Sequence, residues 1–181
     1  MAELTVTEAR SERDYEDVRS LCNGLLDWLR VRYAHESWSI DRYYAPDKWA
    51  AVMADLPRLH APPNGDILIA RLNAAPVGCV MLQKLDETTC EMKRLFVPPE
   101  ARGHGVGRKL CERLMILAAG RGYRTMRLDT GIHHDEAIAL YRSLGFRMRS
   151  PYYDFPQDMA HLLHFMEADL PAAKGLMEGA R

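Results

Sequence analysis

Three glycines, Gly103, Gly105 and Gly107, alternate with other residues in the middle of the chain, directly after Arg102. Apolar residues at helical spacing follow them, so the glycines stand at the N-terminus of an expected helix. A turn without side chains lets a ligand reach backbone N–H groups, and a helix N-terminus favours negative charge. These residue types at this spacing therefore predict a site for an anion such as a pyrophosphate.

Two common phosphate-binding motifs do not fit this turn. A P-loop requires G-x-x-x-x-G-K-[ST], but Leu110 stands where the hydroxyl residue would follow Lys109. A dinucleotide fingerprint requires G-x-G-x-x-G, but Arg108 occupies the position of the last glycine. A third pattern, R-x-x-G-x-G, is met by Arg102, Gly105 and Gly107.

The segment before the turn, Thr89 to Val97, is expected to be a strand that stops at Pro98-Pro99. Its apolar residues change phase, because Cys90 and Met92 are even-numbered whereas Leu95 and Val97 are odd-numbered. A regular strand keeps one phase, so the change predicts a β-bulge near Lys93-Arg94. The alternative is a strand buried on both faces, which the polar residues Glu91, Lys93 and Arg94 make less favourable.

A second pattern lies downstream, where His134 to Phe146 reads H-x-x-A-x-x-L-Y-x-x-L-G-F. With both patterns present, the sequence resembles the GNAT superfamily of acyl-CoA-dependent N-acyltransferases. The resemblance covers about Val6 to Leu170. It implies an α/β fold with a single mixed, mostly antiparallel central sheet and helices on both faces, which the expected order of strands and helices also fits.

The resemblance implies acetyl-CoA as the acyl donor. The pyrophosphate would lie on the backbone of Arg102, Gly103, His104, Gly105, Val106 and Gly107, and the pantetheine along Leu95, Phe96 and Val97. One N–H of that strand would stabilise the thioester oxygen as negative charge develops. Arg102 could instead be an ordinary surface arginine, and His104 could simply face solvent.

Three further residues are candidates for the chemistry. In the family a tyrosine at the position of Tyr141 commonly protonates the departing CoA thiolate, although Tyr141 could also be a core aromatic. Glu91 is either a general base, acting directly or through water, or a solvated strand carboxylate. His134 replaces the family's usual asparagine and can still donate a hydrogen bond to the cofactor. The run His133–Glu136 fits no common zinc spacing, so no metal site is expected.

The amine acceptor would lie among aromatic residues and carboxylates, an environment that suits a small amine cation. The residues that could form it are Trp28, Tyr33, Trp38, Tyr43, Tyr44, Tyr152, Tyr153 and Phe155, with Glu36, Asp41 and Asp154. For any single aromatic residue, the simpler interpretation is that it covers the core. A peptide N-terminus and a protein lysine stay open as acceptors.

The surrounding elements follow from hydrophobic periodicity and turn signals. Helices are expected at Asp14–Tyr33, Pro46–Leu56, after the glycine turn until Gly122, and at His134–Leu144. Further strands are expected at Leu4–Ala9, Asp66–Leu72, Val77–Leu85, Arg124–Thr130, around Phe146–Met148, and at His161–Leu170. Loops or connectors are expected at His35–Asp41, Leu56–Gly65 and Pro151–Gln157, and a tail that frays or docks as a short helix at Pro171–Arg181.

Length and composition set the remaining expectations. A chain of 181 residues predicts one domain, 1–181, with a core at about 6–170. A net charge of −1 argues against nucleic acid as the main partner. Four scattered cysteines indicate buried free thiols, and no signal peptide or membrane-spanning run is seen, so a cytoplasmic protein is expected. A homodimer stays open.

The function expected from the resemblance is an N-acetyltransferase that transfers the acetyl group of acetyl-CoA to a primary amine, by direct attack in a ternary complex. Two alternatives remain at this point. A non-catalytic acyl-CoA sensor would keep the glycine turn without turnover, and a nucleotide-dependent enzyme of the Rossmann kind would prefer NAD(P).

Overall fold

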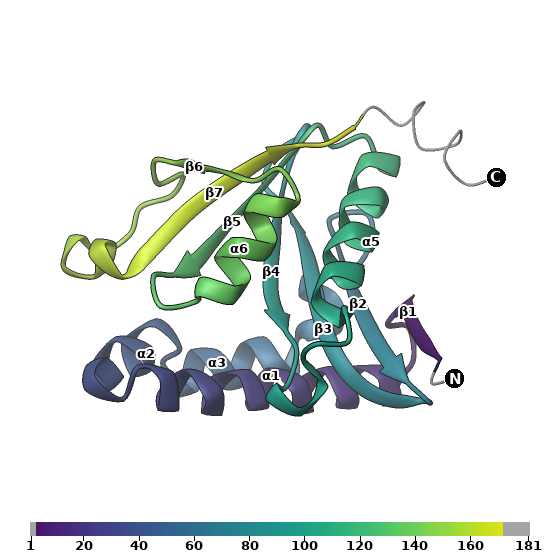
Figure 1. Cartoon of the computed structure of the whole chain (residues 1–181), viewed down its shortest axis with the longest axis horizontal. Coiled ribbons are helices and arrows are strands. Elements are labelled where there is room, and N and C mark those ends of the chain that lie inside the picture. Colours follow the sequence, from purple (N-terminus) through teal and green to yellow (C-terminus); the bar gives the residue numbers. More distant parts are fainter. Residues whose placement is uncertain (1–2, 172–181) are drawn as a thin grey trace. The chain divides into compact units, whose positions relative to one another are not determined.

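The structure, a computed structural model, describes residues 3–171. Its strands form one seven-stranded sheet in the order β1-β2-β3-β4-β5-β7-β6 (Figure 1). The pairs β1–β2, β5–β7 and β6–β7 are antiparallel, whereas β4–β5 is parallel. The strands are β1 Leu4–Glu8, β2 Gly65–Leu72, β3 Ala75–Lys84, β4 Thr89–Phe96, β5 Thr125–Gly131, β6 Arg147–Arg149 and β7 Leu163–Asp169. The predicted mixed, mostly antiparallel α/β fold is confirmed.

Six α-helices are present in the described residues: α1 Glu12–Arg32, α2 Ser37–Tyr43, α3 Pro46–Ala54, α4 Leu56–Leu59, α5 Val106–Gly120 and α6 Asp135–Ser143. Short 3-10 turns lie at Ala34–Glu36, Pro99–Ala101 and Gln157–Leu162. The contacts divide the chain into two compact units, which share β3, β4 and α5. Unit 1 holds Met1–Met81 and Arg94–Cys111, and unit 2 holds Leu82–Lys93 and Glu112–Arg181. A single domain stays a prediction.

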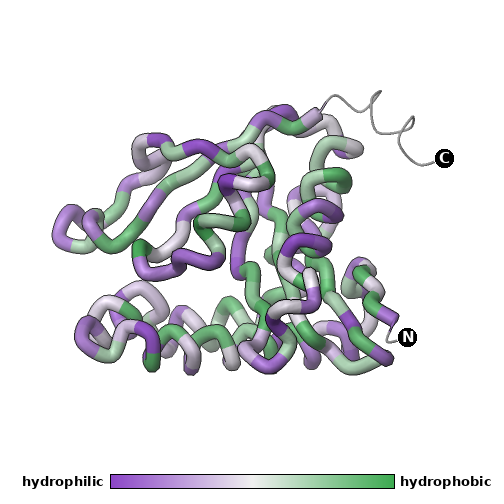
Figure 2. Tube along the Cα trace, in the orientation of Figure 1, coloured by the Kyte–Doolittle hydropathy of each residue, from purple (hydrophilic) through white to green (hydrophobic). Residues whose placement is uncertain are grey.

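The core of unit 1 is a cluster of buried apolar residues contributed by α1 to α4 and by β2 to β4. Figure 2 shows hydrophobic and hydrophilic residues alternating along α1, as in an amphipathic helix. The buried side chains of α1 are Val18, Leu21, Cys22, Leu25, Leu26 and Leu29. They pack with residues that include Ile40, Met53, Leu56, Ile67, Ile69, Met81 and Phe96.

Two glycines let helices approach the sheet closely in unit 1. A Cβ on Gly24 of α1 would lie 3.3 Å from the Phe96 ring. A Cβ on Gly78 of β3 would lie 3.0 Å from the Phe96 carbonyl oxygen and 3.0 Å from a methyl of Leu110 in α5. Both contacts are tighter than ordinary packing, so a larger residue at 24 would push α1 away from Phe96 and a larger residue at 78 would push α5 away from β3. Gly78 therefore sets how closely the start of α5 approaches the sheet.

Polar contacts at its N-terminus fasten α1 to β2. Ser11 and Asp14 form a reciprocal capping box. Arg71 of β2 donates to Asp14 and to Asp17 at 2.7 Å each. The Ser11 hydroxyl and N–H, together with Arg71, hold the pKa of the Asp14 carboxyl well below its usual range. The ionised carboxylate is thus the form that the folded chain stabilises.

Unit 2 is built around β5, β7 and α6. β5 pairs with β7 over its whole length, from Thr125 opposite Asp169 to Gly131 opposite Leu163. Met126, Leu128 and Met166 are fully or almost fully buried on these two strands. The chain leaves α6 through Gly145, whose φ is 90°, and β6 then pairs with β7.

Several of the expected boundaries were wrong, including those of the following three segments. His35–Asp41 is not a loop, since it holds a 3-10 turn and most of α2. Burial of Ile40 in the core, with the Ser39 hydroxyl donating to the Glu36 carbonyl at 2.7 Å, stabilises the helix despite poor local propensity. The Leu56–Gly65 connector includes the one-turn helix α4, which buries Leu56. The last strand begins at Leu163 rather than His161. The expected tail at 171–181 lies outside the described residues, except for Pro171.

Candidate functional site

The glycine-rich turn joins β4 to α5 in unit 1. Gly103 and Gly105 have φ values of 81° and 73°, a backbone conformation that other residues rarely adopt. A Cβ on either glycine would meet no other atom within 4 Å. The helix starts directly after the turn, with Lys109 N–H donating to the Gly105 carbonyl at 3.0 Å. The turn therefore presents open space in front of a 15-residue helix.

Arg102 lies beside this turn and is exposed. Its Nε donates to the carbonyl of Val97 at 3.0 Å, and its guanidinium lies 4.7 Å from the ring of Trp28. The two contacts hold a cation next to the N-terminus of α5, where the helix dipole already favours an anion. Arg102 is thus suited to phosphate contact.

The irregularity expected in β4 is found at Arg94. This residue has a φ of 51°, which is uncommon for a residue with a side chain. The parallel pairing of β4 with β5 covers Thr89, Cys90 and Glu91, before this residue. The residues predicted to contact pantetheine, Leu95 to Val97, come directly after it.

Glu91 is buried, and both of its carboxylate oxygens are engaged in unit 2. The Tyr152 hydroxyl donates to one oxygen at 2.6 Å, and the Lys93 ammonium donates to the other at 2.9 Å. Burial and then the negative charge of Glu91 raise the pKa of Tyr152 well above its ordinary value. Tyr152 therefore stays protonated at neutral pH and keeps donating to Glu91.

The loop before β7 carries a second tyrosine–carboxylate pair. The Tyr153 hydroxyl donates to Asp129 of β5 at 2.9 Å, and the ring of Tyr153 packs edge-on against Tyr152 with 5.2 Å between centroids. Both tyrosine rings and that of Phe155 pack against Phe165 of β7. This aromatic cluster fixes the loop over β5 and β7.

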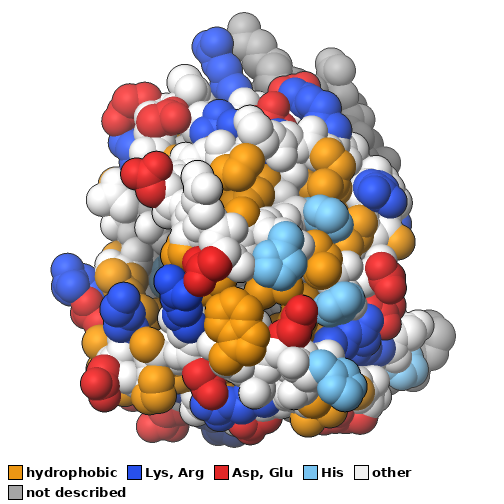
Figure 3. Space-filling view, turned by 90° about the vertical axis from the view of Figure 1, so that its left-hand side faces the viewer, with side chains coloured by type: hydrophobic (Ala, Val, Ile, Leu, Met, Phe, Trp, Pro, Cys, Tyr) orange, Lys and Arg blue, Asp and Glu red, His pale blue; other side chains and the backbone are white. Residues whose placement is uncertain are grey.

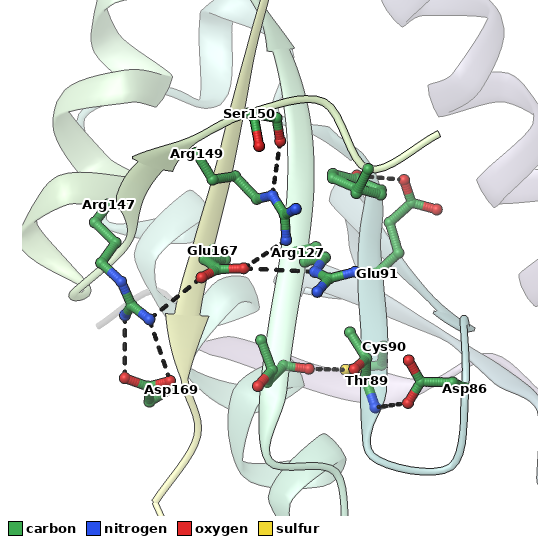
Figure 4. Close-up of polar contacts among 12 residues, drawn as sticks. Asp86, Thr89, Cys90, Glu91, Arg127, Arg147, Arg149, Ser150, Glu167 and Asp169 are labelled. Carbon is green, nitrogen blue, oxygen red and sulfur yellow. Dashed lines mark hydrogen bonds and ion pairs between the residues drawn. The ribbon is translucent and has the colours of Figure 1, made fainter. Parts of the chain in front are cut away.

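An arginine–glutamate network lies next to this cluster. Glu167 of β7 contacts Arg127 at 3.5 Å, Arg147 at 3.3 Å and Arg149 at 2.7 Å (Figure 4). The guanidinium groups of Arg127 and Arg149 also lie 5.5 Å and 5.3 Å from the ring of Tyr152. Tyr152 is consequently held by its hydroxyl and by its ring.

Tyr141 lies in α6, and His134 directly precedes this helix. Tyr141 is largely buried, and its ring centroid lies 5.7 Å from that of Phe146. His134 Nδ1 lies 3.2 Å from the hydroxyl of Thr130, at the end of β5. The structure thus puts Tyr141, His134 and Glu91 in unit 2, and it puts Leu95–Val97 and Arg102–Gly107 in unit 1.

Most of the aromatic residues considered for the acceptor pocket have other contacts. Tyr33 is buried in the core of unit 1, Tyr44 packs edge-on against Trp49, and Trp28 lies next to Arg32 and Arg102. Trp38 is half-exposed. Covering the core therefore explains several of these residues.

Two residues of interest were missed in the sequence. The sequence marks Tyr152 only as one of the aromatic residues that could surround the acceptor, because its hydrogen bond to Glu91 joins residues 61 positions apart. Arg94 was considered only as a sign of the bulge. No sequence signal distinguishes Arg94 from the neighbouring charged residues Glu91 and Lys93 of the same strand.

Within residues 3–171, no group of three or more His, Cys, Asp or Glu side chains is placed to hold a metal ion. No helix in the same range is long and apolar enough to cross a membrane. On the face shown in Figure 3, acidic and basic side chains are interspersed. The cysteines Cys22, Cys79, Cys90 and Cys111 are free and buried, as expected.

Comparison with known proteins agrees with the geometry. Residues 23–146 match the model of the acetyltransferase (GNAT) family. An uncharacterised N-acetyltransferase of Schizosaccharomyces pombe is 38% identical over 106 residues, which are 58% of this chain and 65% of the relative. An IAA acetyltransferase of Azospirillum brasilense is 39% identical over 111 residues, which are 61% of this chain and 71% of the relative. The chain therefore spans just under two thirds of the first relative.

A solved structure shares the fold. The PaiA N-acetyltransferase of Thermoplasma acidophilum, determined in complex with coenzyme A, superimposes with a TM-score of 0.68. The match covers 92% of this chain and 99% of that one, at 18% sequence identity.

Proposed function

The chain belongs to the GNAT acetyltransferase family, a family of acyltransferase enzymes, and on that premise we propose that it transfers the acetyl group of acetyl-CoA to a primary amine of a small molecule. The amine attacks the thioester directly in a ternary complex. The observation that carries the proposal is the open glycine turn at the N-terminus of α5, where Gly103 and Gly105 leave the backbone accessible.

The residues of the turn fit a pyrophosphate. In the proposal, the backbone N–H groups of residues 102–107 bind it, and Arg102 adds a positive charge. The coenzyme A complex of the Thermoplasma relative supports this cofactor. Leu95 to Val97 lie directly before the turn and bind the pantetheine through their backbone, and one of their N–H groups stabilises the thioester oxygen. His134 adds a polar contact to the cofactor.

Tyr141 and Glu91 are the proposed proton donor and acceptor. Tyr141 protonates the departing thiolate. Glu91 is the general base, but both of its oxygens already accept hydrogen bonds. A proton from the amine therefore reaches Glu91 through the Tyr152 hydroxyl, which gives its own proton to the carboxylate as it accepts the new one. Tyr152 thereby replaces water in this role.

The free, buried cysteines support the further proposal of a cytoplasmic location. A homodimer stays a prediction.

The test of this proposal is a melting-temperature series. Acetyl-CoA and CoA should stabilise the fold by about 2.7 kcal/mol at a hundredfold excess over the dissociation constant, since a ligand that binds only the native state acts by mass action. NADH and ATP at equal concentration should produce no comparable shift. A shift with NADH and none with acetyl-CoA would contradict the proposal.

A further inference from the structure

Arg94 has a strained backbone and a half-buried cationic side chain in unit 1. A non-glycine residue with φ of 51° persists only where the surroundings hold it, and such residues cluster at functional sites. Its guanidinium lies 5.8 Å from the ring of Trp49. The side chain therefore packs against Trp49 and stays only partly exposed.

Among residues 3–171, the polar contacts of the Arg94 side chain are with an imidazole and a thioether. One terminal nitrogen, Nη1, lies 3.4 Å from Nε2 of His60 and 3.7 Å from the sulfur of Met81. A guanidinium can only donate, so Nη1 is the donor in any hydrogen bond with Nε2 of the buried His60. Neither contact neutralises the positive charge.

The Arg94 charge has no acidic partner among residues 3–171, and its buried Nε lacks a hydrogen bond there. Other arginines of unit 1 are well paired: Arg71 binds two aspartates, and Arg10 binds Asp66 through two bonds at 2.7 Å and 3.0 Å. Withdrawing a charge from water without a partner is unfavourable. Nε is also withdrawn from solvent, so Nη2, which has no hydrogen bond among residues 3–171, is the nitrogen left for a ligand.

The chemistry of that nitrogen selects the ligand. A guanidinium N–H donates a charge-assisted hydrogen bond to a carboxylate, which carries one negative charge. A single cation beside the apolar Trp49 and Met81 balances one negative charge, which matches a carboxylate better than a phosphate dianion. Arg94 also directly precedes Leu95–Val97, the strand that the proposed function assigns to the pantetheine.

We propose that Arg94 binds a carboxylate carried by the amine acceptor, so that the enzyme selects amino-acid-like acceptors over plain amines. The claim that the carboxylate belongs to the amine acceptor rests on the proposed function. The claim that Arg94 binds a carboxylate does not. His60 and Trp49 hold the guanidinium in place, and Arg94 is a specificity residue that takes no part in the proton transfers.

The test compares free L-amino acids with their carboxamides as acceptors, for the parent, Arg94→Gln and Arg94→Lys. The parent should favour the free acids by at least about tenfold in kcat/KM, because the charge-assisted hydrogen bond to the carboxylate is lost in the amide. Arg94→Gln should abolish that preference through KM while the kcat/KM of the carboxamides stays near parental. Arg94→Lys should retain part of it. Arg32→Gln, which removes another arginine next to a tryptophan of unit 1, should leave the preference unchanged.

A binding experiment separates this inference from the proposed function. N-acetyl amino acids, which carry the carboxylate but no free amine, should raise the melting temperature of the parent and not that of Arg94→Gln, even if no amine is acetylated. Three results would overturn the inference: a parent that uses acids and amides equally, a preference that survives in Arg94→Gln, or a loss of acetyl-CoA affinity in that variant. If Arg94→Gln does not fold, the comparison of Arg94→Lys with the parent decides. A purely structural role of Arg94 predicts that every folded variant keeps the parental preference for free acids over carboxamides.

Discussion

Replacing Gly105 by valine is expected to weaken acetyl-CoA binding by at least about tenfold, equivalent to about 1.4 kcal/mol. The branched side chain would occupy the open space in front of α5 and keep the pyrophosphate from the backbone N–H groups. Hydrogen bonds to a charged ligand contribute about 1.5–3 kcal/mol each, so the loss of one suffices for this effect. Gly107→Val in the first turn of α5 should act in the same direction. Isothermal titration with acetyl-CoA measures both.

The matched control for Gly105→Val is Gly122→Val. Gly122 also has positive φ, 92°, and a Cβ there would also meet no atom within 4 Å. The two variants share the backbone strain, but Gly122 lies at the other end of α5. Both should lose similar stability, and Gly105→Val alone should lose acetyl-CoA affinity. If Gly105→Val and Gly107→Val both bind acetyl-CoA with parental affinity, the two glycines have a structural role and do not contact the cofactor.

Replacing Tyr141 by phenylalanine is expected to lower kcat, because only the hydroxyl is removed and the ring can still pack against Phe146. General acid catalysis typically contributes ~10²–10⁴-fold. The CoA thiolate is a good leaving group. If water also protonates it, the decrease in kcat lies at the lower end of that range or below it. Stopped assays of kcat measure the effect once an acceptor is known, alongside melting temperature and acetyl-CoA affinity, which should both stay near parental.

Tyr123→Phe is the control for this variant. Tyr123 is another buried tyrosine, and it follows the C-terminal end of α5. Tyr123→Phe should leave kcat unchanged. A stable Tyr141→Phe enzyme with parental kcat would leave Tyr141 as a core aromatic.

The parts of the fold that sequence could predict are those encoded by local patterns. The phase change in β4 located the irregularity that the structure has at Arg94, because side chains of a strand alternate strictly. The glycine turn and α5 were likewise recognisable from spacing. Helix α2 was missed because the burial of Ile40 depends on residues distant in sequence.

Contacts between distant residues could not be read from spacing. A glycine within a helix lowers helix propensity, and only the packing of Phe96 on Gly24 explains its presence in α1. The candidate base Glu91 could be identified as a polar residue in a strand, but its bonds to Tyr152 and Lys93 could not. The same holds for Arg94, whose lack of an acidic partner in the described residues is a property of three-dimensional packing.

The most direct test of acetyl transfer is a panel of amines incubated with acetyl-CoA, in which CoA release and acetylated amine are both measured. The account predicts that one CoA is released for each amine acetylated, and that double-reciprocal plots intersect because both substrates bind before reaction. No turnover with any amine, despite acetyl-CoA binding, would indicate a sensor. An acetylated enzyme formed without amine, with parallel plots, would contradict direct attack in a ternary complex.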